Sequence, residues 1–281
     1  MRRIITVLIA AGVLGAAAWF GLSGTQVDSP ASMIRAISGQ KTSDIPDTPD
    51  EWKGRIDYVD LDGRFSEMAS RPEMAGLAVA IVENGELRFV GTYGVLDRTD
   101  GSPVTPFSIF RWASVSKTVT GALAATLASD AAIDLEEPLS SWNSSLRLPG
   151  GAETQITLAQ LLSQQTGLTK NAYDEKLEEG ENPADLRARL VSAPLQCLPG
   201  TCHTYQNIAF DDASEILAQA ADRPFAAAVS ERLFLPLGMT SATYGMAGLT
   251  GAEQWARPHN GPQVRTLREA YWRVPAPAGV N

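Results

Sequence analysis

The chain has 281 residues, enough for one large domain or two small ones with a substantial hydrophobic core. Its hydrophobic content of 44% is typical of a globular protein. Its net charge of −9, with no basic stripe, argues against binding to nucleic acid, so we expect no nucleic-acid partner.

The N-terminus has the pattern of an export signal. Arg2 and Arg3 precede an uncharged, apolar run from Ile4 to Leu22, which is typical of a secretory signal or an uncleaved signal anchor. The run is just long enough to cross a bilayer as a helix. We expect an exported, periplasmic protein, anchored to the inner membrane by residues 4–22 or released after signal cleavage.

The composition divides the chain into three regions. Residues 1–22 form the signal peptide or signal anchor, and residues 23–51, rich in Ser, Thr, Asp and Pro, are typical of a flexible linker. Residues 52–281 would form the folded domain, and residues 52–72 would supply its first short helix.

Two β-rich runs, Gly76–Val82 and Glu86–Val95, lie on either side of Asn84-Gly85. An Asn-Gly pair between such runs is a strong signal for a β-hairpin. From Lys117 to about Arg232 the pattern is mainly helical. Within that section we expect helices after a cap at Thr157 and over Asp185–Val191, Phe210–Ala221 and Pro224–Leu235.

This order of elements predicts an α+β fold, with an antiparallel sheet packed against a helical subdomain. One hairpin alone is too small to be a stable sheet, and no convincing strand pattern follows Met239. We therefore expect the remaining strands in a C-terminal part beyond Asn281.

Ser114 and Lys117 form a Ser-x-x-Lys pair at the start of an apolar helical run that continues to Ala132. Residues three apart lie on one face of a helix, so the hydroxyl and the amine would lie side by side. A serine hydroxyl needs an adjacent base to become a nucleophile, and burial near a helix N-terminus would lower the pKa of Lys117. The alternative is a helix-capping serine beside a solvated lysine. The motif is weak alone, since Ser38–Lys41 in the linker also matches it.

Cys197 and Cys202, the two cysteines of the chain, flank a Pro199-Gly200 turn. Because an exported protein permits disulfides and the turn could bring the two residues together, we predict a Cys197–Cys202 bridge. The alternative is a pair of buried thiols. A metal site fits poorly because the spacing is not Cys-x-x-Cys and only His203 is nearby. We expect neither a metal nor a cofactor.

Tyr205 and Asn207 follow this loop directly. Side chains two apart point the same way when the backbone is extended. Tyr205 near Lys117 would share a proton network, and Asn207 offers a donor and an acceptor for a substrate amide. The alternative is a buried tyrosine and an ordinary loop asparagine.

Together these segments resemble the serine β-lactamase and penicillin-binding-protein superfamily, specifically its class C β-lactamase-like branch. The resemblance covers about Gly76 to Asn281 and rests on several segments in family order. They are Gly76–Val82, Phe110–Lys117, Leu161–Leu168, Pro199–Asn207 and Pro236–Met239. Weak matches that occur in one order are far more specific than any single one.

The resemblance implies roles for individual residues. Ser114 would attack an acyl carbonyl and form an acyl-enzyme, while Lys117 and Tyr205 would share the base and acid roles. Asn207 would hold the substrate amide, and Asn171 falls near a position where relatives often carry a glutamine that contacts substrate. The oxyanion hole would use the backbone N–H of Ser114 and one from a sheet strand.

The family's third motif, Lys-Thr-Gly or His-x-Gly on a core strand, is expected later in the chain. His259–Gly261 has the right letters, but it precedes Pro277–Val280, which resembles a segment that should come first. We therefore interpret His259–Gly261 as a chance match.

The motifs predict a serine hydrolase of β-lactams, D-amino peptides or small esters, so its partner would be a small-molecule or peptidoglycan-like substrate. The alternative is a penicillin-binding or sensor module, or an inactive relative, that acylates without efficient turnover. A Ser-His-Asp hydrolase is disfavoured because only His203 and His259 are available and no Gly-x-Ser-x-Gly elbow exists. The same two histidines make a poor zinc site.

Overall fold

This computed structural model describes residues 56–281, so the predicted signal segment and linker lie outside the described residues. The chain divides into two compact units. We call them the sheet unit (the described residues up to Ser108, with Ala256–Thr266) and the helical unit (Ile109–Trp255, with Leu267–Asn281). Over residues 56–281, none of the helices has the length and apolar character needed to span a membrane.

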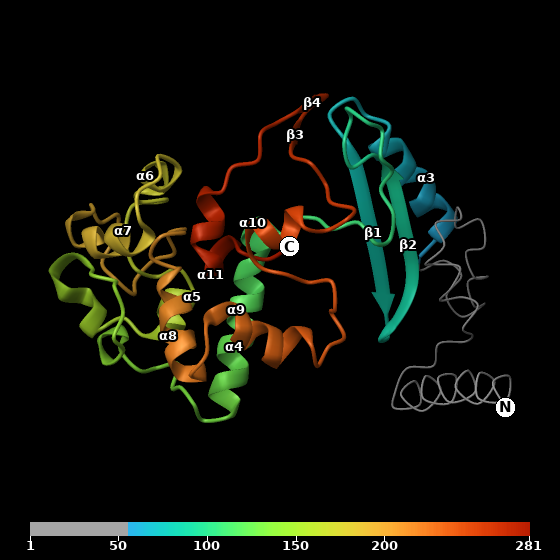
Figure 1. The fold of residues 1–281 in the computed structure, drawn as a ribbon. Coiled ribbons are helices and arrows are strands. Elements are labelled where there is room, and N and C mark those ends of the chain that lie inside the picture. Colours follow the sequence, from blue (N-terminus) through green and yellow to red (C-terminus); the bar gives the residue numbers. More distant parts are fainter. Residues whose placement is uncertain (1–55) are drawn as a thin grey trace, which may run out of the picture. The chain divides into compact units, whose positions relative to one another are not determined.

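The sheet unit contains the predicted hairpin. Strands β1 (Gly76–Glu83) and β2 (Glu86–Gly94) pair in antiparallel register across the Asn84-Gly85 turn, whose φ angles are 52° and 79°. The helix α3 (Tyr58–Ala69) packs against the hairpin, as the blue and teal ribbons of Figure 1 show. The ring of Phe89 on β2 joins the two elements, with its centroid 6.1 Å from that of Tyr58.

A second, shorter hairpin also belongs to the sheet unit. Strands β3 (His259–Asn260) and β4 (Gln263–Val264) pair antiparallel around Gly261, whose φ is 57°. Both strands lie after Met239, where the sequence has no convincing strand pattern. Strands of two residues are too short to show the alternation on which strand prediction depends.

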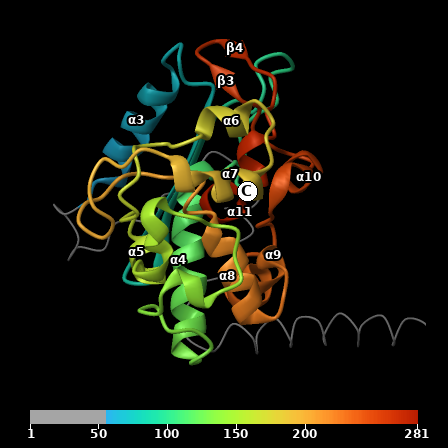
Figure 2. The same ribbon diagram turned by 90° about the vertical axis from the view of Figure 1, so that its left-hand side faces the viewer.

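The helical unit is built around α4 (Ser116–Ser129), whose Leu123, Ala124 and Leu127 are almost completely buried. Figures 1 and 2 both show α8 and α9 beside α4, and α11 packs on it as well. The other elements of this unit are mostly short. In chain order the elements are η2 (Ala113–Val115), α4, η3 (Leu139–Ser141), η4 (Pro149–Thr154), α5 (Leu158–Leu162), α6 (Asp174–Glu178), α7 (Pro183–Arg189), η5 (Leu190–Ser192), α8 (Asp212–Ala221), α9 (Phe225–Val229), the π-helical η6 (Ser230–Phe234), α10 (Gly245–Thr250), η7 (Ala270–Arg273) and α11 (Pro275–Ala278).

The fold class is α+β, as predicted, but the mainly helical section is less regular than expected. The helix that contains Lys117 ends at Ser129 rather than Ala132, because Ala131 has a φ of 56° that a right-handed helix does not allow. The helix predicted over Pro224–Leu235 is divided into α9 and η6. The section is therefore helical as predicted, but α4 is shorter than expected and the last helix changes to π-helical geometry at Ser230.

The predicted helix cap at Thr157 is confirmed. The Thr157 hydroxyl accepts the N–H of Gln160 at 3.2 Å, and the Gln160 side chain accepts the N–H of Thr157 at 3.1 Å, which completes a capping box. The helix expected over Asp185–Val191 instead covers Pro183–Arg189, because Pro183 is its first residue and the Asn182 side chain caps it by accepting the N–H of Ala184 at 2.8 Å.

Candidate active site

Ser114 lies on the single turn η2, directly ahead of α4. The residue before it, Ala113, has a φ of 47°, a left-handed conformation that costs energy for any residue with a Cβ. Lys117, on the first turn of α4, places its Nζ 3.4 Å from the Ser114 Oγ. Ser116, between them, is fully buried and accepts the N–H of Val280 at 3.0 Å. The sequence spacing therefore brings the hydroxyl and the amine together while Ser116 anchors the turn.

Tyr205 and Asn207 meet Lys117 from a distant part of the chain. The Lys117 Nζ donates to the Tyr205 hydroxyl at 2.6 Å and to the Asn207 Oδ1 at 2.8 Å. The Tyr205 hydroxyl donates in turn to the Ser114 Oγ at 2.7 Å. The carbonyl of Pro277 lies 3.4 Å from Nζ. Tyr205 thus forms the direct hydrogen-bonded link between the lysine and the serine.

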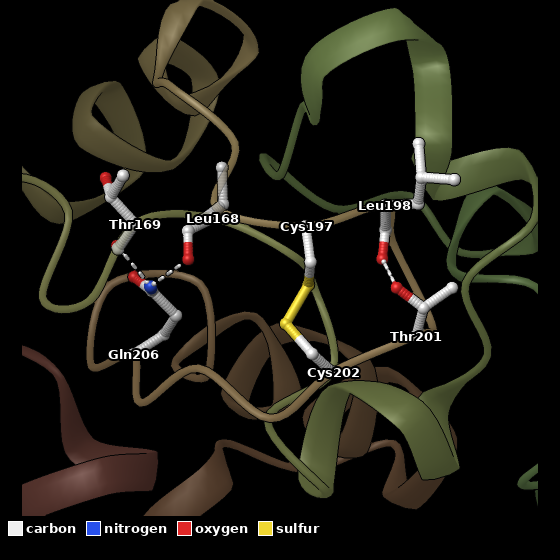
Figure 3. Close-up of a disulfide and its surroundings, with 7 residues drawn as sticks. All are labelled: Leu168, Thr169, Cys197, Leu198, Thr201, Cys202 and Gln206. Carbon is white, nitrogen blue, oxygen red and sulfur yellow. Dashed lines mark hydrogen bonds between the residues drawn. A yellow bond between two sulfur atoms is a disulfide. The ribbon is translucent and has the colours of Figure 1, made fainter.

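Gln206 explains why its two neighbours face the same way. Its side chain is fully buried and bonds the loop of Leu168, Thr169 and Ala172. Its amide nitrogen donates to the Thr169 carbonyl at 2.6 Å, and its amide oxygen accepts the N–H of Ala172 at 3.2 Å. The backbone N–H of Gln206 donates to the Gln164 side chain at 2.7 Å. Figure 3 shows the Gln206 amide bonded to the loop at Leu168 and Thr169, so Gln206 fixes the position of the Tyr205–Asn207 segment.

The loop ahead of Tyr205 is closed by a disulfide between Cys197 and Cys202, whose Cα atoms lie 6.3 Å apart (Figure 3). This is the bridge that the sequence predicts. Gly200, with a φ of 80°, makes the turn between the two cysteines. Gly167 packs under the loop, where a Cβ would lie 2.6 Å from the Cys197 carbonyl oxygen. The disulfide and this close packing together fix the route of the chain into the site.

Burial lowers the pKa of Lys117 below its ordinary value. The hydrogen bond that Lys117 donates to Tyr205 and the negative charges of Asp174 and Asp211 oppose this effect, but burial dominates. The direction is the one that the sequence predicts. A lysine with a lowered pKa is neutral in a larger fraction of molecules near pH 7, and only the neutral form can accept a proton.

Asp174 is the group that the sequence analysis missed. Its side chain is 7% exposed, and its Oδ2 accepts the amide N–H of Asn207 at 2.7 Å and lies 3.5 Å from the Tyr271 hydroxyl. Burial raises the pKa of Asp174, although the bond from Asn207 works in the opposite direction. The only local signal is that Asp174 and the buried Leu177 lie three apart, on one face of α6.

The side chains of the remaining candidates form no hydrogen bond with Ser114, Lys117, Tyr205 or Asn207 among the described residues. Asn171 donates its backbone N–H to the Tyr205 carbonyl at 2.9 Å, while its side chain is exposed. His203 is also exposed. His259 belongs to the sheet unit, where its ring accepts the N–H of Arg98 at 3.3 Å and contacts the carbonyl of Arg257 at 2.8 Å. Nowhere in residues 56–281 do three His, Cys, Asp or Glu side chains gather as metal ligands.

Comparison with known proteins places this fold in the class of β-lactamases and penicillin-binding proteins. A solved class C β-lactamase superposes with a TM-score of 0.65 at 20% identity, covering 81% of this chain and 63% of that one. A profile of the Beta-lactamase family matches residues 61–280. The chain therefore belongs to the Beta-lactamase family.

Relatives in this family carry different activities in their names. Esterase EstB of Burkholderia gladioli is 29% identical over 237 residues, covering 78% of this chain and 59% of the esterase. D-alanyl-D-alanine-carboxypeptidase/endopeptidase AmpH of Escherichia coli K12 is 28% identical over 176 residues, covering 60% of this chain and 45% of AmpH. The chain thus spans about half the length of the curated relatives it matches.

Proposed function

We propose that this protein is a serine hydrolase that forms an acyl-enzyme at Ser114. The observation that carries the proposal is the short hydrogen-bonded chain from Lys117 through the Tyr205 hydroxyl to the Ser114 Oγ, with links of 2.6 and 2.7 Å. Such a chain provides a serine with the adjacent base that it needs to act as a nucleophile.

The chemistry follows from these contacts. As the Ser114 Oγ attacks the acyl carbon, its proton passes to the Tyr205 oxygen, the Tyr205 proton passes to the neutral Lys117 amine, and the carbonyl π electrons move onto the carbonyl oxygen. When the tetrahedral intermediate collapses, the bond to the leaving nitrogen or oxygen breaks and the pair returns the proton to that atom. Water then attacks the acyl carbon and gives a proton to the same pair; the bond from the acyl carbon to Oγ breaks, the carboxylic acid leaves, and the pair returns the proton to the Ser114 Oγ.

Asn207 contributes to substrate binding in this scheme. Its Oδ1 is occupied by Lys117, and one of its two amide N–H groups is occupied by Asp174. An asparagine amide has two such donors, so the second can donate to the carbonyl oxygen of a substrate amide. Asn171 has an exposed side chain, and its backbone N–H donates to the Tyr205 carbonyl. We assign it a secondary contact with the substrate.

The proposed substrates are β-lactams, D-amino peptides and small esters. All three contain a carbonyl that can acylate a serine, and they differ in the leaving group and in how readily the acyl-enzyme is hydrolysed. The names of the family relatives, an esterase and a D-alanyl-D-alanine carboxypeptidase, support the ester and peptide classes.

We also propose that the protein acts outside the cytoplasm, in the periplasm. The apolar run Ile4–Leu22 behind Arg2 and Arg3 supports export. The Cys197–Cys202 disulfide supports it independently, since disulfides persist in oxidising compartments.

The test is intact-mass spectrometry over time, with benzylpenicillin and with p-nitrophenyl acetate in separate reactions and Ser114→Ala as the control. We expect a mass increase on the parent protein that the alanine variant lacks. A transient adduct with released product identifies a turnover enzyme, whereas a persistent penicillin adduct identifies the penicillin-binding or sensor alternative. Equal labelling of Ser114→Ala would refute Ser114 as the nucleophile.

A further inference from the structure

We propose that Asp174 is a positioning residue of this site: its carboxylate fixes the orientation of the Asn207 amide, and its negative charge acts on Lys117 across that amide. The inference rests on the proposed function, because it assigns Asp174 to the same centre as Ser114. No motif in the sequence identifies this residue.

The orientation argument starts from the two contacts of the Asn207 side chain. Its Oδ1 accepts the Lys117 Nζ at 2.8 Å, and its Nδ2 donates to the Asp174 Oδ2 at 2.7 Å. Rotating the amide by half a turn would place its N–H groups against the amine and its oxygen against the carboxylate. Both contacts would then become unfavourable, so Lys117 and Asp174 together select one orientation.

That orientation matters to a substrate. With its oxygen held by Lys117, the amide presents N–H groups elsewhere, and Asp174 engages only one of them. Asn207 is 7% exposed, so little water is available to replace a lost partner. Without Asp174 the amide could rotate, and its free N–H would no longer be directed consistently at a substrate carbonyl.

Burying the Asp174 carboxylate costs free energy that packing alone does not offset. Asp174 is 7% exposed, and its Oδ1 is buried without a hydrogen-bond partner among the described residues. A buried carboxylate oxygen without a partner carries a desolvation penalty, so its presence calls for an explanation. An electrostatic role toward Lys117 supplies one, since a charge that is incompletely neutralised by hydrogen bonds exerts a stronger field.

Several charged or titratable groups surround this pair. Glu178 faces Asp174 from its own helix α6, and its carboxylate accepts the hydroxyl of Tyr271 on η7 at 2.9 Å; that hydroxyl is also 3.5 Å from the Asp174 Oδ2. Lys117 faces Asp174 from α4. The other groups that act on Lys117 are Tyr205 and Asp211, which precede α8. A test must therefore change the charge of Asp174 and leave these neighbours in place.

Asp174→Asn meets this requirement. The asparagine keeps the size of the side chain and can still accept the Asn207 N–H, but it removes the charge. Because burial already lowers the pKa of Lys117 and Asp174 opposes that effect, the variant should lower the pKa further. Neutral Lys117 would then persist to lower pH, so the acid limb of kcat/KM should move to lower pH by about one unit.

Two further variants separate orientation from charge. Asp174→Ala removes both the acceptor and the charge, so we expect the same shift of the acid limb together with a fall in kcat of roughly tenfold. Glu175→Gln is the matched control, because it removes a carboxylate from the next position of α6, where the side chain is exposed. It should leave both the rate and the pH profile unchanged.

The experiment measures the pH profile of p-nitrophenyl acetate hydrolysis, together with the titration of the Lys117 amine by NMR with nitrogen-15-labelled lysine. The NMR readout requires no turnover, so failure of the proposed function (no labelling of Ser114) is distinguished from failure of this inference. A lower Lys117 midpoint in Asp174→Asn but not in Glu175→Gln supports the proposal. An unchanged midpoint, or slower hydrolysis with an unshifted acid limb, overturns it and leaves Asp174 a structural residue only.

Discussion

Tyr205→Phe is the substitution that tests the catalytic arrangement most directly. It removes one oxygen atom, the one that lies 2.7 Å from the Ser114 Oγ and 2.6 Å from the Lys117 Nζ. The phenylalanine ring can occupy the same space, so the remainder of the site should persist. The substitution therefore isolates the hydrogen-bonded link from the packing around it.

The size of the expected effect follows from what remains. Without the hydroxyl, Lys117 keeps its contacts with Asn207 at 2.8 Å and with the Pro277 carbonyl, and its Nζ is still 3.4 Å from the Ser114 Oγ. A direct but longer route for the proton therefore survives. Loss of a well-placed acid–base group costs about 10²–10⁴ in rate, and we expect the lower end, about a hundredfold or roughly 2.7 kcal/mol in activation free energy.

The assay is the pre-steady-state rate of Ser114 acylation by p-nitrophenyl acetate, with Ser114→Ala as the background. The structure also predicts a change in pH dependence: the Tyr205 hydroxyl opposes the effect of burial on the pKa of Lys117, so its loss should move the acid limb of the residual activity to lower pH. Acylation by Tyr205→Phe at the parent rate would refute the role of this hydroxyl as the link between Lys117 and Ser114.

Three further predictions concern stability. Opening the Cys197–Cys202 bridge with the double serine variant should lower the free energy of unfolding in urea by about 2 kcal/mol, because the closed loop is short at a sequence separation of 5; an unchanged unfolding midpoint would contradict this. Gly167→Ala should cost about 1–3 kcal/mol, since it adds a clash with the Cys197 carbonyl to a strained φ of +79°, whereas Gly180→Ala has a positive φ but no atom within 4 Å and should cost less. Arg187→Met should lower thermal stability by roughly 3–5 kcal/mol, because it strands the buried carboxylates that Arg187 contacts; the loss should be smaller at pH 5 than at pH 8, where those carboxylates are more fully ionised.

The parts of the fold that the sequence predicts well depend on local interactions. The Asn84-Gly85 turn, the Thr157 cap and the three-residue spacing of Ser114 and Lys117 all operate within a few residues, so each is visible in a short window of sequence. The predicted helix lengths were less accurate. Ala131 ends α4 in a left-handed conformation, where its N–H donates to the Ala128 carbonyl at 3.0 Å and the N–H of Ala132 donates to the Leu127 carbonyl at 2.9 Å. Glycine is the usual residue at this position, so an alanine there gives the sequence no signal for the helix end.

The parts of the site that the sequence could not predict depend on long-range contacts. The Pro277 carbonyl and Tyr271 reach the site from near the end of the described chain, and Asp174 reaches it from α6. None carries a spacing that relates it to Ser114. An aspartate in a short, charged helix is usually a solvated residue, and only the fold shows that this one is buried against Asn207.

The Tyr-x-Asn motif depends on its middle residue, which the motif itself does not specify. Its middle residue, Gln206, forms no contact with Lys117, yet it is the most buried of the three and its side chain and backbone bind four different residues. Hydrogen bonds hold the Gln206 side chain in the core, while Tyr205 and Asn207 on either side of it both contact the Lys117 Nζ, so the middle residue fixes the segment that carries the other two. All three residues of the motif therefore matter. Gln206, at the position where the motif accepts any residue, holds the backbone that positions Tyr205 and Asn207.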